Sequence, residues 1–307
     1  MRVTSDDVQA FLRDRGFSGV HAIERIGHGE WSTAFSFAVV DRTGEYVVRF
    51  SAVDEDFRKD QHAVRYATPA LPVPPLLDVG PAFDGFYAIA ERVPGQFLDD
   101  LDAEHMRQVL PSLWAALTAM RDADVSATHG YGPWDRRGDA PFGSWADALL
   151  AMGMDRPESR IAGWRSALEQ SPTGAEPFDQ AFGRLRALAG DLPNERHVVH
   201  SDLLNYNVLV RGERLTAVLD WGSEMYGDWL FDLAWFSFWQ PWFPAWAAID
   251  FEAEARRYFD TIDDFDLRVQ CSKIAIGLDN QAYCAFKGEA RWEQLAAVAE
   301  RTLSVSS

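Results

Sequence analysis

The chain has few cysteines, few lysines and no long apolar run. Cys271 and Cys284 are its only cysteines, so the sequence offers no disulfide framework and no cysteine-based metal cluster. The most apolar stretch, 230–249, is interrupted by an aspartate, a glutamine and two prolines, which excludes a membrane-spanning helix there. Residues 1–16 are polar and charged and lack the apolar core of a signal peptide. We therefore expect a cytoplasmic protein with no membrane partner.

Positive charge is also scarce. The 29 Lys and Arg residues face 47 Asp and Glu residues, which gives a net charge of −18 at pH 7. Such a surface repels phosphate backbones, so nucleic acid is excluded as a partner, whereas a cationic small molecule would be attracted. Acidity serves solubility alone in many proteins, so the charge supports a cationic substrate only together with other features. We expect a monomer.

The order of the predicted elements indicates an α+β fold. Hydrophobic content of 47% in 307 residues allows one large or two moderate domains. A short helix begins near Ser5, and the next segments alternate as strands, with one helix among them. Strands are predicted at 21–27, 34–41, 45–51, 76–80 and 86–91, with the helix at 54–68. Later helices are predicted at 103–123, 144–154, 178–189, 228–239, 246–259 and 267–286, and a long loop at 128–141.

This order is that of the amino-terminal lobe of a kinase, followed by a mainly helical lobe. The predicted small lobe, 1–92, carries an antiparallel sheet with one helix and binds nucleotide. The predicted large lobe, 93–307, carries catalysis and substrate binding. The hinge between them is expected at about 91–95.

The segment 200–207 holds the most informative motif. His200, Asp202 and Asn207 follow the pattern H-x-D-x-x-x-x-N, and Asp220 ends an apolar strand eighteen residues after Asp202. Kinases use this layout to hold a hydroxyl, ATP and magnesium together. Oxygen ligands suit Mg²⁺, which takes part of its shell from nucleotide phosphates. The alternative is a β-hairpin with polar turns in an unrelated fold, which the flanking apolar strands disfavour.

Several segments resemble the aminoglycoside phosphotransferase family, within the protein-kinase-like fold. The resemblance runs almost end to end and is strongest at 200–207, 217–221, 227–228 and 232–234. The segments most similar to members that act on hygromycin B are 31–37, 70–74, 130–133, 238–242 and 277–279. The resemblance implies a bilobal α+β fold and an ATP-dependent O-phosphotransferase that inactivates an antibiotic such as hygromycin B, with ATP or GTP and Mg²⁺ as cofactors. A kinase for another hydroxylated metabolite (an amino alcohol, a sugar or a macrolide) and a nucleotide-binding pseudokinase are the alternatives.

The resemblance implies roles for the motif residues. Asp202 is the expected catalytic base or hydroxyl-orienting carboxylate, and Asn207 and Asp220 are the expected Mg²⁺ ligands. His200 is expected to be structural rather than a proton-transfer group. Asn205 lies inside the loop and is expected to touch substrate or solvent.

Nucleotide binding depends on weaker signals. Gly27 and Gly29 form a fragment of a glycine-rich loop that can bring backbone N–H groups near phosphates, with Ser32 assisting. Arg49 stands where kinase-like folds usually have lysine; it can contact two phosphate oxygens, or it can simply lie on the sheet surface. Asp60 is its expected acidic partner.

The hinge backbone at Glu91 and Val93 is expected to bind adenine.

The acceptor site is expected among tryptophans and carboxylates in 224–246. Trp239 and Trp242 suit the faces of sugar rings and ammonium groups. Glu224 and Asp228 suit amino groups through charge-assisted hydrogen bonds. Asp232 is assigned a structural role in fastening the metal loop, with substrate contact as the alternative.

Overall fold

The structure of the chain is a computed structural model, and it describes residues 3–27, 31–40 and 42–306. The chain divides into two compact units. Unit 1 comprises Met1–Ala119, Asp135–Gly138 and Leu203–Glu224, and unit 2 comprises Met120–Trp134, Asp139–Asp202 and Met225–Ser307. The lobes expected at 1–92 and 93–307 are divisions by function, and they stay a prediction.

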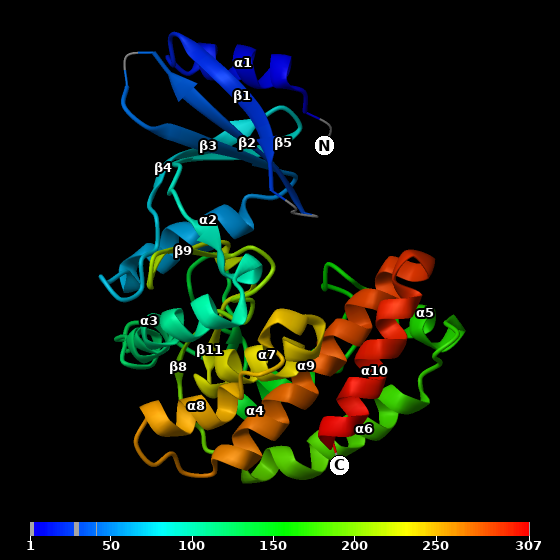
Figure 1. Cartoon of the computed structure of the whole chain (residues 1–307). Coiled ribbons are helices and arrows are strands. Elements are labelled where there is room, and N and C mark those ends of the chain that lie inside the picture. Colours follow the sequence, from blue (N-terminus) through cyan, green and yellow to red (C-terminus); the bar gives the residue numbers. More distant parts are fainter. Residues whose placement is uncertain (1–2, 28–30, 41, 307) are drawn as a thin grey trace. The chain divides into compact units, whose positions relative to one another are not determined.

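A five-stranded antiparallel sheet forms the first part of unit 1 (Figure 1). Its strands lie in the order β1 (Val20–Ile26), β2 (Ser32–Val39), β3 (Glu45–Ser51), β5 (Gly85–Glu91) and β4 (Leu76–Ala82). Side chains alternate between the two faces of a strand, and in β3 Tyr46, Val48 and Phe50 are buried. Arg49 therefore lies on the opposite face of the sheet.

Helix α1 (Ser5–Asp14) packs on the face that carries Phe50. A capping box begins the helix, because the Thr4 side chain and the Asp7 side chain each accept a backbone N–H of the other residue. Val8 and Leu12, four residues apart, are fully buried in the core of this sheet. The apolar face of the sheet is thus closed by the first helix.

Helix α2 (Glu55–Ala63) follows β3 and is unusual in what it buries. Its buried residues are Phe57, Lys59, Asp60 and Ala63, so two of the four carry charge. A long charged side chain is seldom fully buried unless it is paired. The partners of Lys59 and Asp60 therefore decide what this helix does.

A second, three-stranded sheet completes unit 1. Its order is β10 (Arg214–Val218), β9 (Val208–Arg211) and β6 (Gln96–Phe97), and helix α3 (Ala103–Arg121) follows β6 along the chain. Gly212 makes the β9–β10 turn at φ +59°, a conformation that glycine adopts without strain. The pairing of Val208 with Val218 fixes the register of this hairpin.

Unit 2 is mainly helical and contains one small sheet. The sheet has the order β7 (Gly132–Pro133), β11 (Met225–Gly227) and β8 (His197–Val199). The helices are α4 (Trp145–Met152), α5 (Trp164–Gln170), α6 (Glu176–Leu188), α7 (Leu230–Trp239), α8 (Phe251–Tyr258), α9 (Phe265–Lys287) and α10 (Trp292–Ser306). All ten residues of α7 are buried, which makes it the most enclosed helix of the described chain.

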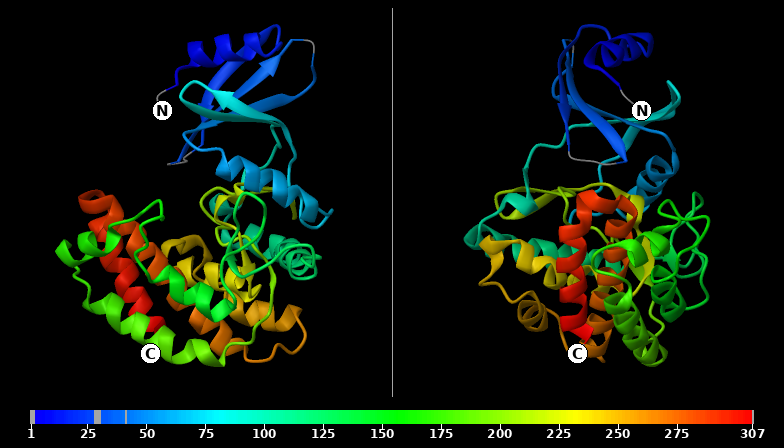
Figure 2. Two further views of the ribbon diagram at one scale, coloured as in Figure 1. Left: turned by 180° about the vertical axis from the view of Figure 1, so that it is seen from behind. Right: turned by 90° about the vertical axis from the view of Figure 1, so that its right-hand side faces the viewer.

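Helix α9 organises the packing of unit 2. It contacts α5, α6, α7 and α10, and Figure 2 shows it running beside α10. Gly277 permits the close approach of α10, because a Cβ at that position would lie 2.1 Å from Oγ1 of Thr302. The core of this unit is therefore built around one long helix.

Short 3₁₀ turns lie at Val64–Tyr66, Leu98–Asp100, Ala189–Asp191, Trp221–Ser223, Gln240–Trp242, Pro244–Trp246 and Gly288–Arg291. Within the described ranges, no helix combines the length and the hydropathy needed to cross a membrane.

The predicted α+β class is confirmed, and so is the element order of the first 91 residues. Two helices, α5 and α10, were not predicted. The helix predicted at 246–259 begins only at Phe251, where the Asp250 side chain accepts the Ala253 N–H at 2.9 Å. The loop predicted at 128–141 contains the short strand β7.

Candidate active site

The loop that carries Asp202 is held by a buried carboxylate in unit 2. Asp232, in the first turn of α7, accepts the His200 N–H at 2.8 Å and the Ser201 N–H at 2.7 Å. Ser201 adopts a left-handed φ of +62°, which a serine seldom takes without external support. The predicted structural role of Asp232 is consistent with these bonds, which hold the loop around Asp202 rather than the metal loop.

His200 has no exposed surface, and its ring contacts the backbone of the same loop. The N–H of Asp202 points to Nδ1 of His200 at 3.2 Å, so this nitrogen acts as the acceptor and the proton lies on Nε2. A histidine held in this way shapes the loop, in line with the structural role expected for it.

The charge state of Asp232 depends on a balance of opposing effects. Burial raises the pKa of this carboxyl to about 7, although the hydrogen bonds from His200 and Ser201 oppose the rise. The loop that carries Asp202 is therefore tied to a group that titrates near neutral pH.

The predicted metal ligands lie together in unit 1. The register of β9 with β10 places Asn207 opposite Leu219, and the Leu219 N–H donates to the Asn207 carbonyl oxygen at 2.7 Å. Asp220 comes next, with a left-handed φ of +55°. The hairpin thus brings Asn207 and Asp220 close in space, as the sequence indicates.

The donor set of this hairpin suits magnesium. In the described ranges, no three His, Cys, Asp or Glu side chains gather as an all-protein metal site requires. One amide oxygen from Asn207 and one carboxylate from Asp220 match the habit of Mg²⁺, which uses one or two carboxylates and completes its shell with phosphates and water.

Two residues in the same loop adopt strained backbone conformations. Asn205 and Tyr206 both have positive φ values, +60° and +66°. The Tyr206 N–H donates to Oδ2 of Asp99 at 3.1 Å, which supports this conformation. Asn205 is exposed, as a substrate contact would require.

Arg49 and Asp60 form an ion pair in unit 1, as predicted from the sequence. Asp60 also accepts the Trp221 N–H at 2.9 Å, directly after Asp220. Burial alone would lower the pKa of Arg49, but Asp60, Asp220 and Asp56 together outweigh it, so the pKa is raised. Arg49 therefore remains a cation close to the predicted metal ligands.

The other predicted nucleotide contacts are only partly described. Gly27 follows β1 with φ +81°, and Ser32 begins β2 as a half-buried residue. Gly29 lies outside the described residues. Glu91 ends β5, and with Val93 it lines a cavity of about 270 Å³ whose other walls are Pro72, Val73, Pro74, Pro75, Leu77 and Thr216. The assignment of adenine to this region stays a prediction.

The two predicted acceptor tryptophans differ in exposure. Their rings pack edge to face with centroids 5.0 Å apart in unit 2. Trp239 is 9% exposed, whereas Trp242 is 36% exposed and stacks on Phe238. Trp242 is therefore available to a ligand, and Trp239 mainly supports it.

Two of the predicted substrate contacts are buried in the structure. Asp228 has no exposed surface, and its two oxygens each lie 2.7 Å from nitrogens of the Arg268 guanidinium. Glu224 also has no exposed surface, and it lies 3.7 Å from Nζ of Lys59. Both carboxylates are buried and face a cation inside the protein, and their assignment to the substrate stays a prediction.

Three residues around this site were not predicted. Lys59 and Arg268 pair with the two buried carboxylates, and Arg136 pairs with Asp54 at the start of α2. One feature of the sequence could have indicated a role for Lys59: the chain has only three lysines, and this one adjoins Asp60.

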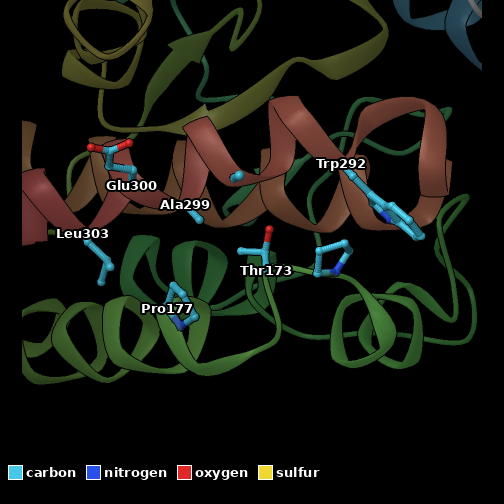
Figure 3. Close-up of a pocket in the computed structure, with 8 residues that line it drawn as sticks. Thr173, Pro177, Trp292, Ala299, Glu300 and Leu303 are labelled. Carbon is cyan, nitrogen blue, oxygen red and sulfur yellow. The ribbon is translucent and has the colours of Figure 1, made fainter.

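A separate apolar groove lies in unit 2, between α10 and the segment that begins α6 (Figure 3). Its volume is about 380 Å³. It is lined by Pro172, Thr173, Pro177, Trp292, Ala296, Ala299, Glu300 and Leu303. None of the predicted site residues lines this groove.

The chain is similar to known phosphotransferases over most of its length. Residues 22–266 match the phosphotransferase enzyme family, APH. A hygromycin-B 4-O-kinase of Escherichia coli is 34% identical over 242 residues, which is 78% of this chain and 68% of that protein.

Solved structures extend the similarity to the whole chain. The aminoglycoside phosphotransferase APH(4)-Ia superposes with a TM-score of 0.85 at 30% identity, over 99% of this chain and 98% of that one. A thermostable mutant of it, solved with AMP-PNP and hygromycin B, gives a TM-score of 0.84 at 29% identity and covers 97% of each chain. Spectinomycin phosphotransferase APH(9)-Ia, at 11% identity and a TM-score of 0.62 over 100% of this chain and 98% of that one, shares the fold. This chain belongs to the phosphotransferase enzyme family.

Proposed function

We propose that this protein is an ATP-dependent O-phosphotransferase that modifies a hydroxyl of an aminoglycoside antibiotic, with hygromycin B or a related aminocyclitol as the acceptor. One observation carries the proposal: the chain matches, over 97% of its length, an enzyme solved with AMP-PNP and hygromycin B. The motif at Asp202, Asn207 and Asp220 supports it, because a phosphotransferase needs all three. The result of the reaction would be inactivation of the antibiotic, and hence resistance.

Asp202 serves as the base or orienting carboxylate. The acceptor oxygen forms a bond to the γ-phosphorus as the bond from that phosphorus to the bridging oxygen of ADP breaks. The hydroxyl proton passes to Asp202, and ADP leaves. Since the transition state of phosphoryl transfer is loose, the main task of Asp202 is to align the hydroxyl. Asp232 and His200 keep its loop in shape.

Asn207 and Asp220 would hold Mg²⁺, which when bound neutralises charge on the nucleotide phosphates. Arg49 would contact phosphate oxygens, with Asp60 keeping its guanidinium in place. Gly27 and Ser32, which flank the segment between β1 and β2, would approach the phosphates, Gly29 is assigned to the same role from the sequence, and the hinge backbone at Glu91 and Val93 would bind adenine.

Trp242 and Asn205 are the residues we assign to the acceptor, because both have exposed surface. An indole face suits a sugar ring and attracts ammonium groups. The ring of Trp239 packs against the ring of Trp242 and supports it. The net charge of −18 favours the approach of a polycationic aminocyclitol.

The acceptor is tested with a panel of aminoglycosides, amino alcohols, sugars and macrolides. Each compound is incubated with the protein, ATP and Mg²⁺, and the products are weighed by mass spectrometry. We expect one phosphoryl group on hygromycin B or a related aminocyclitol. Addition to another class alone would assign a different acceptor, and ATP binding without turnover of any compound would indicate a pseudokinase.

We also propose a cytoplasmic location and a monomeric state, which subcellular fractionation and light scattering would test.

A further inference from the structure

A buried lysine on α2 reaches the segment that follows Asp220. Lys59 is 5% exposed, and its ammonium donates to the Gly222 carbonyl oxygen at 2.9 Å. Carboxylate oxygens of Glu224 and Glu55 lie 3.7 Å and 3.6 Å from the same nitrogen. All of these groups lie in unit 1. One ammonium therefore joins the helix to two positions of a five-residue segment, 220–224.

The Glu224 carboxylate is compensated mainly by the Lys59 ammonium and, to a smaller degree, by its own backbone N–H. It is fully buried, and within the described residues neither of its side-chain oxygens has a hydrogen-bond partner in another residue. Burial raises the pKa of Glu224 well above its usual range, and the nearby Lys59 ammonium opposes that rise. A carboxylate in this position is tolerated because a cation faces it.

The neighbouring residue on the helix holds the same segment by a second contact. Asp60 accepts the Trp221 N–H at 2.9 Å while it pairs with Arg49. The approach between helix and segment is close, because a Cβ at Gly222 would lie 3.3 Å from Cγ of Asp56. Residues 59 and 60 thus bind positions 221, 222 and 224 together.

These contacts act on a segment that begins with Asp220, a predicted metal ligand with an unfavourable backbone conformation. Asp220 has a left-handed φ of +55°, which is unfavourable for a residue with a Cβ atom, so its surroundings must stabilise this conformation. Replacing a buried ion pair by apolar groups is often neutral for stability, so overall stability alone does not account for the pair. Its distinct effect is to fix where the segment lies.

We propose that Lys59 and Glu224 are positioning residues for phosphoryl transfer: the pair fastens the segment 220–224 to helix α2 and so aims the Asp220 carboxylate at the nucleotide-bound magnesium. This inference rests on the proposed function and adds two positioning residues to it. Neither residue touches the reacting atoms; both act through Asp220.

The test uses Lys59→Met, Glu224→Gln and the double variant in the full chain. Loss of a residue that orients a metal ligand typically weakens metal binding or activity by about 10–100-fold. We expect the apparent Mg²⁺ affinity, measured by calorimetry with AMP-PNP, to fall by about tenfold or more in Lys59→Met, and kcat to fall with it. The KM for the acceptor should stay unchanged. The double variant should resemble Lys59→Met alone, because the pair acts as a unit.

Amide hydrogen exchange of the ligand-free protein provides an independent readout. Peptides that cover 219–226 should exchange faster in Lys59→Met and Glu224→Gln, while peptides of β1–β3 stay as in the wild type. Glu224→Gln preserves side-chain volume, so it keeps the test usable if Lys59→Met fails to fold.

The matched control is Lys273→Met. Lys273 also pairs with a glutamate, Glu252, at 2.7 Å, but it lies on α9 in unit 2. We expect it to leave Mg²⁺ affinity, kcat and exchange at 219–226 unchanged.

The inference is overturned if folded Lys59→Met and Glu224→Gln proteins bind Mg²⁺ and AMP-PNP like the wild type and exchange at 219–226 at the wild-type rate. Failure of the proposed function is seen separately, as a wild-type protein that phosphorylates no aminocyclitol, because the binding and exchange readouts need no acceptor.

Discussion

At the residue scale, the site combines charged groups that are visible in the sequence with partners that are not. The spacing of Asp202, Asn207 and Asp220 follows from local chain geometry, since a hairpin brings its two ends together. The pairing of Arg49 with Asp60 was also predictable, because a strand and the next helix supply both residues. The partners of Asp228 and Glu224 lie 40 and 165 residues away in the chain, and nothing local indicates that these carboxylates are buried.

Asp232 gives a pH prediction at this scale. Its pKa is raised to about 7 in the folded chain and is about 4 when unfolded, so it stabilises the fold below pH 4 and this contribution is lost as pH rises through 7. In Asp232→Asn this titration is absent. The difference in free energy of unfolding between wild type and variant should therefore shrink by about 3 kcal/mol from pH 5 to pH 8.

Urea unfolding at pH 5, 6, 7 and 8 measures this change. Asp84→Asn, on the exposed turn between β4 and β5, removes a carboxylate without altering the interior and should show no such trend. A constant gap between wild type and Asp232→Asn would contradict the assignment.

Trp242 gives a second prediction. Its ring is 36% exposed, and loss of an aromatic contact with a cationic sugar costs up to about 2 kcal/mol. Trp242→Ala should raise the acceptor KM by about tenfold while the KM for ATP stays the same. Tyr258→Ala, which removes another exposed ring of unit 2, is the control. Equal acceptor KM values in both variants would remove Trp242 from the acceptor site.

At the element scale, the sequence predicted the strands and α2 better than the last helices. In β2 and β3 the large apolar residues recur at every second position (Phe35, Phe37 and Val39, then Tyr46, Val48 and Phe50), and the segments between the strands carry glycine or polar residues. Helix α10 buries Leu295 and Val298, but its other buried residues, Ala299, Thr302 and Ser306, are small or polar and weaken the hydrophobic pattern. Its place beside α9 depends on Gly277, which a reading of α10 alone cannot reveal.

The link between α7 and α9 gives a prediction at this scale. Arg268 on α9 binds both oxygens of Asp228, and Asp228 also accepts the Leu230 N–H at 3.0 Å. Asp228→Asn leaves the buried guanidinium with the half-exposed Glu195 as its remaining acidic partner, and it should lower the free energy of unfolding by about 3 kcal/mol. The double variant Asp228→Leu with Arg268→Met should lose less, because no uncompensated charge remains inside.

Denaturant titration of the three proteins checks this order. Asp266→Asn breaks the exposed pair with Arg256 and should cost no more than about 1 kcal/mol. If the double variant were the least stable of all, the ion pair would be a net source of stability rather than a device that orders the two helices.

At the scale of the whole molecule, fold and family are secure because the similarity covers nearly the entire chain. The element order of residues 1–91 already indicated a kinase-like amino-terminal lobe. The division into compact units was not predictable, because 203–224 and 135–138 join unit 1 through long-range contacts. The loop at 135–138 reaches α2 through the pair of Arg136 with Asp54.

The central claim is that Asp202 drives phosphoryl transfer to a hygromycin-like aminocyclitol. Its most direct test is the steady-state rate of hygromycin B phosphorylation with ATP and Mg²⁺, compared between wild type and Asp202→Asn. We predict that the wild type adds one phosphoryl group and that Asp202→Asn lowers kcat by about 10²–10⁴-fold with nucleotide affinity retained. A wild-type protein that leaves hygromycin B unmodified, or an Asp202→Asn protein with wild-type kcat, would contradict it.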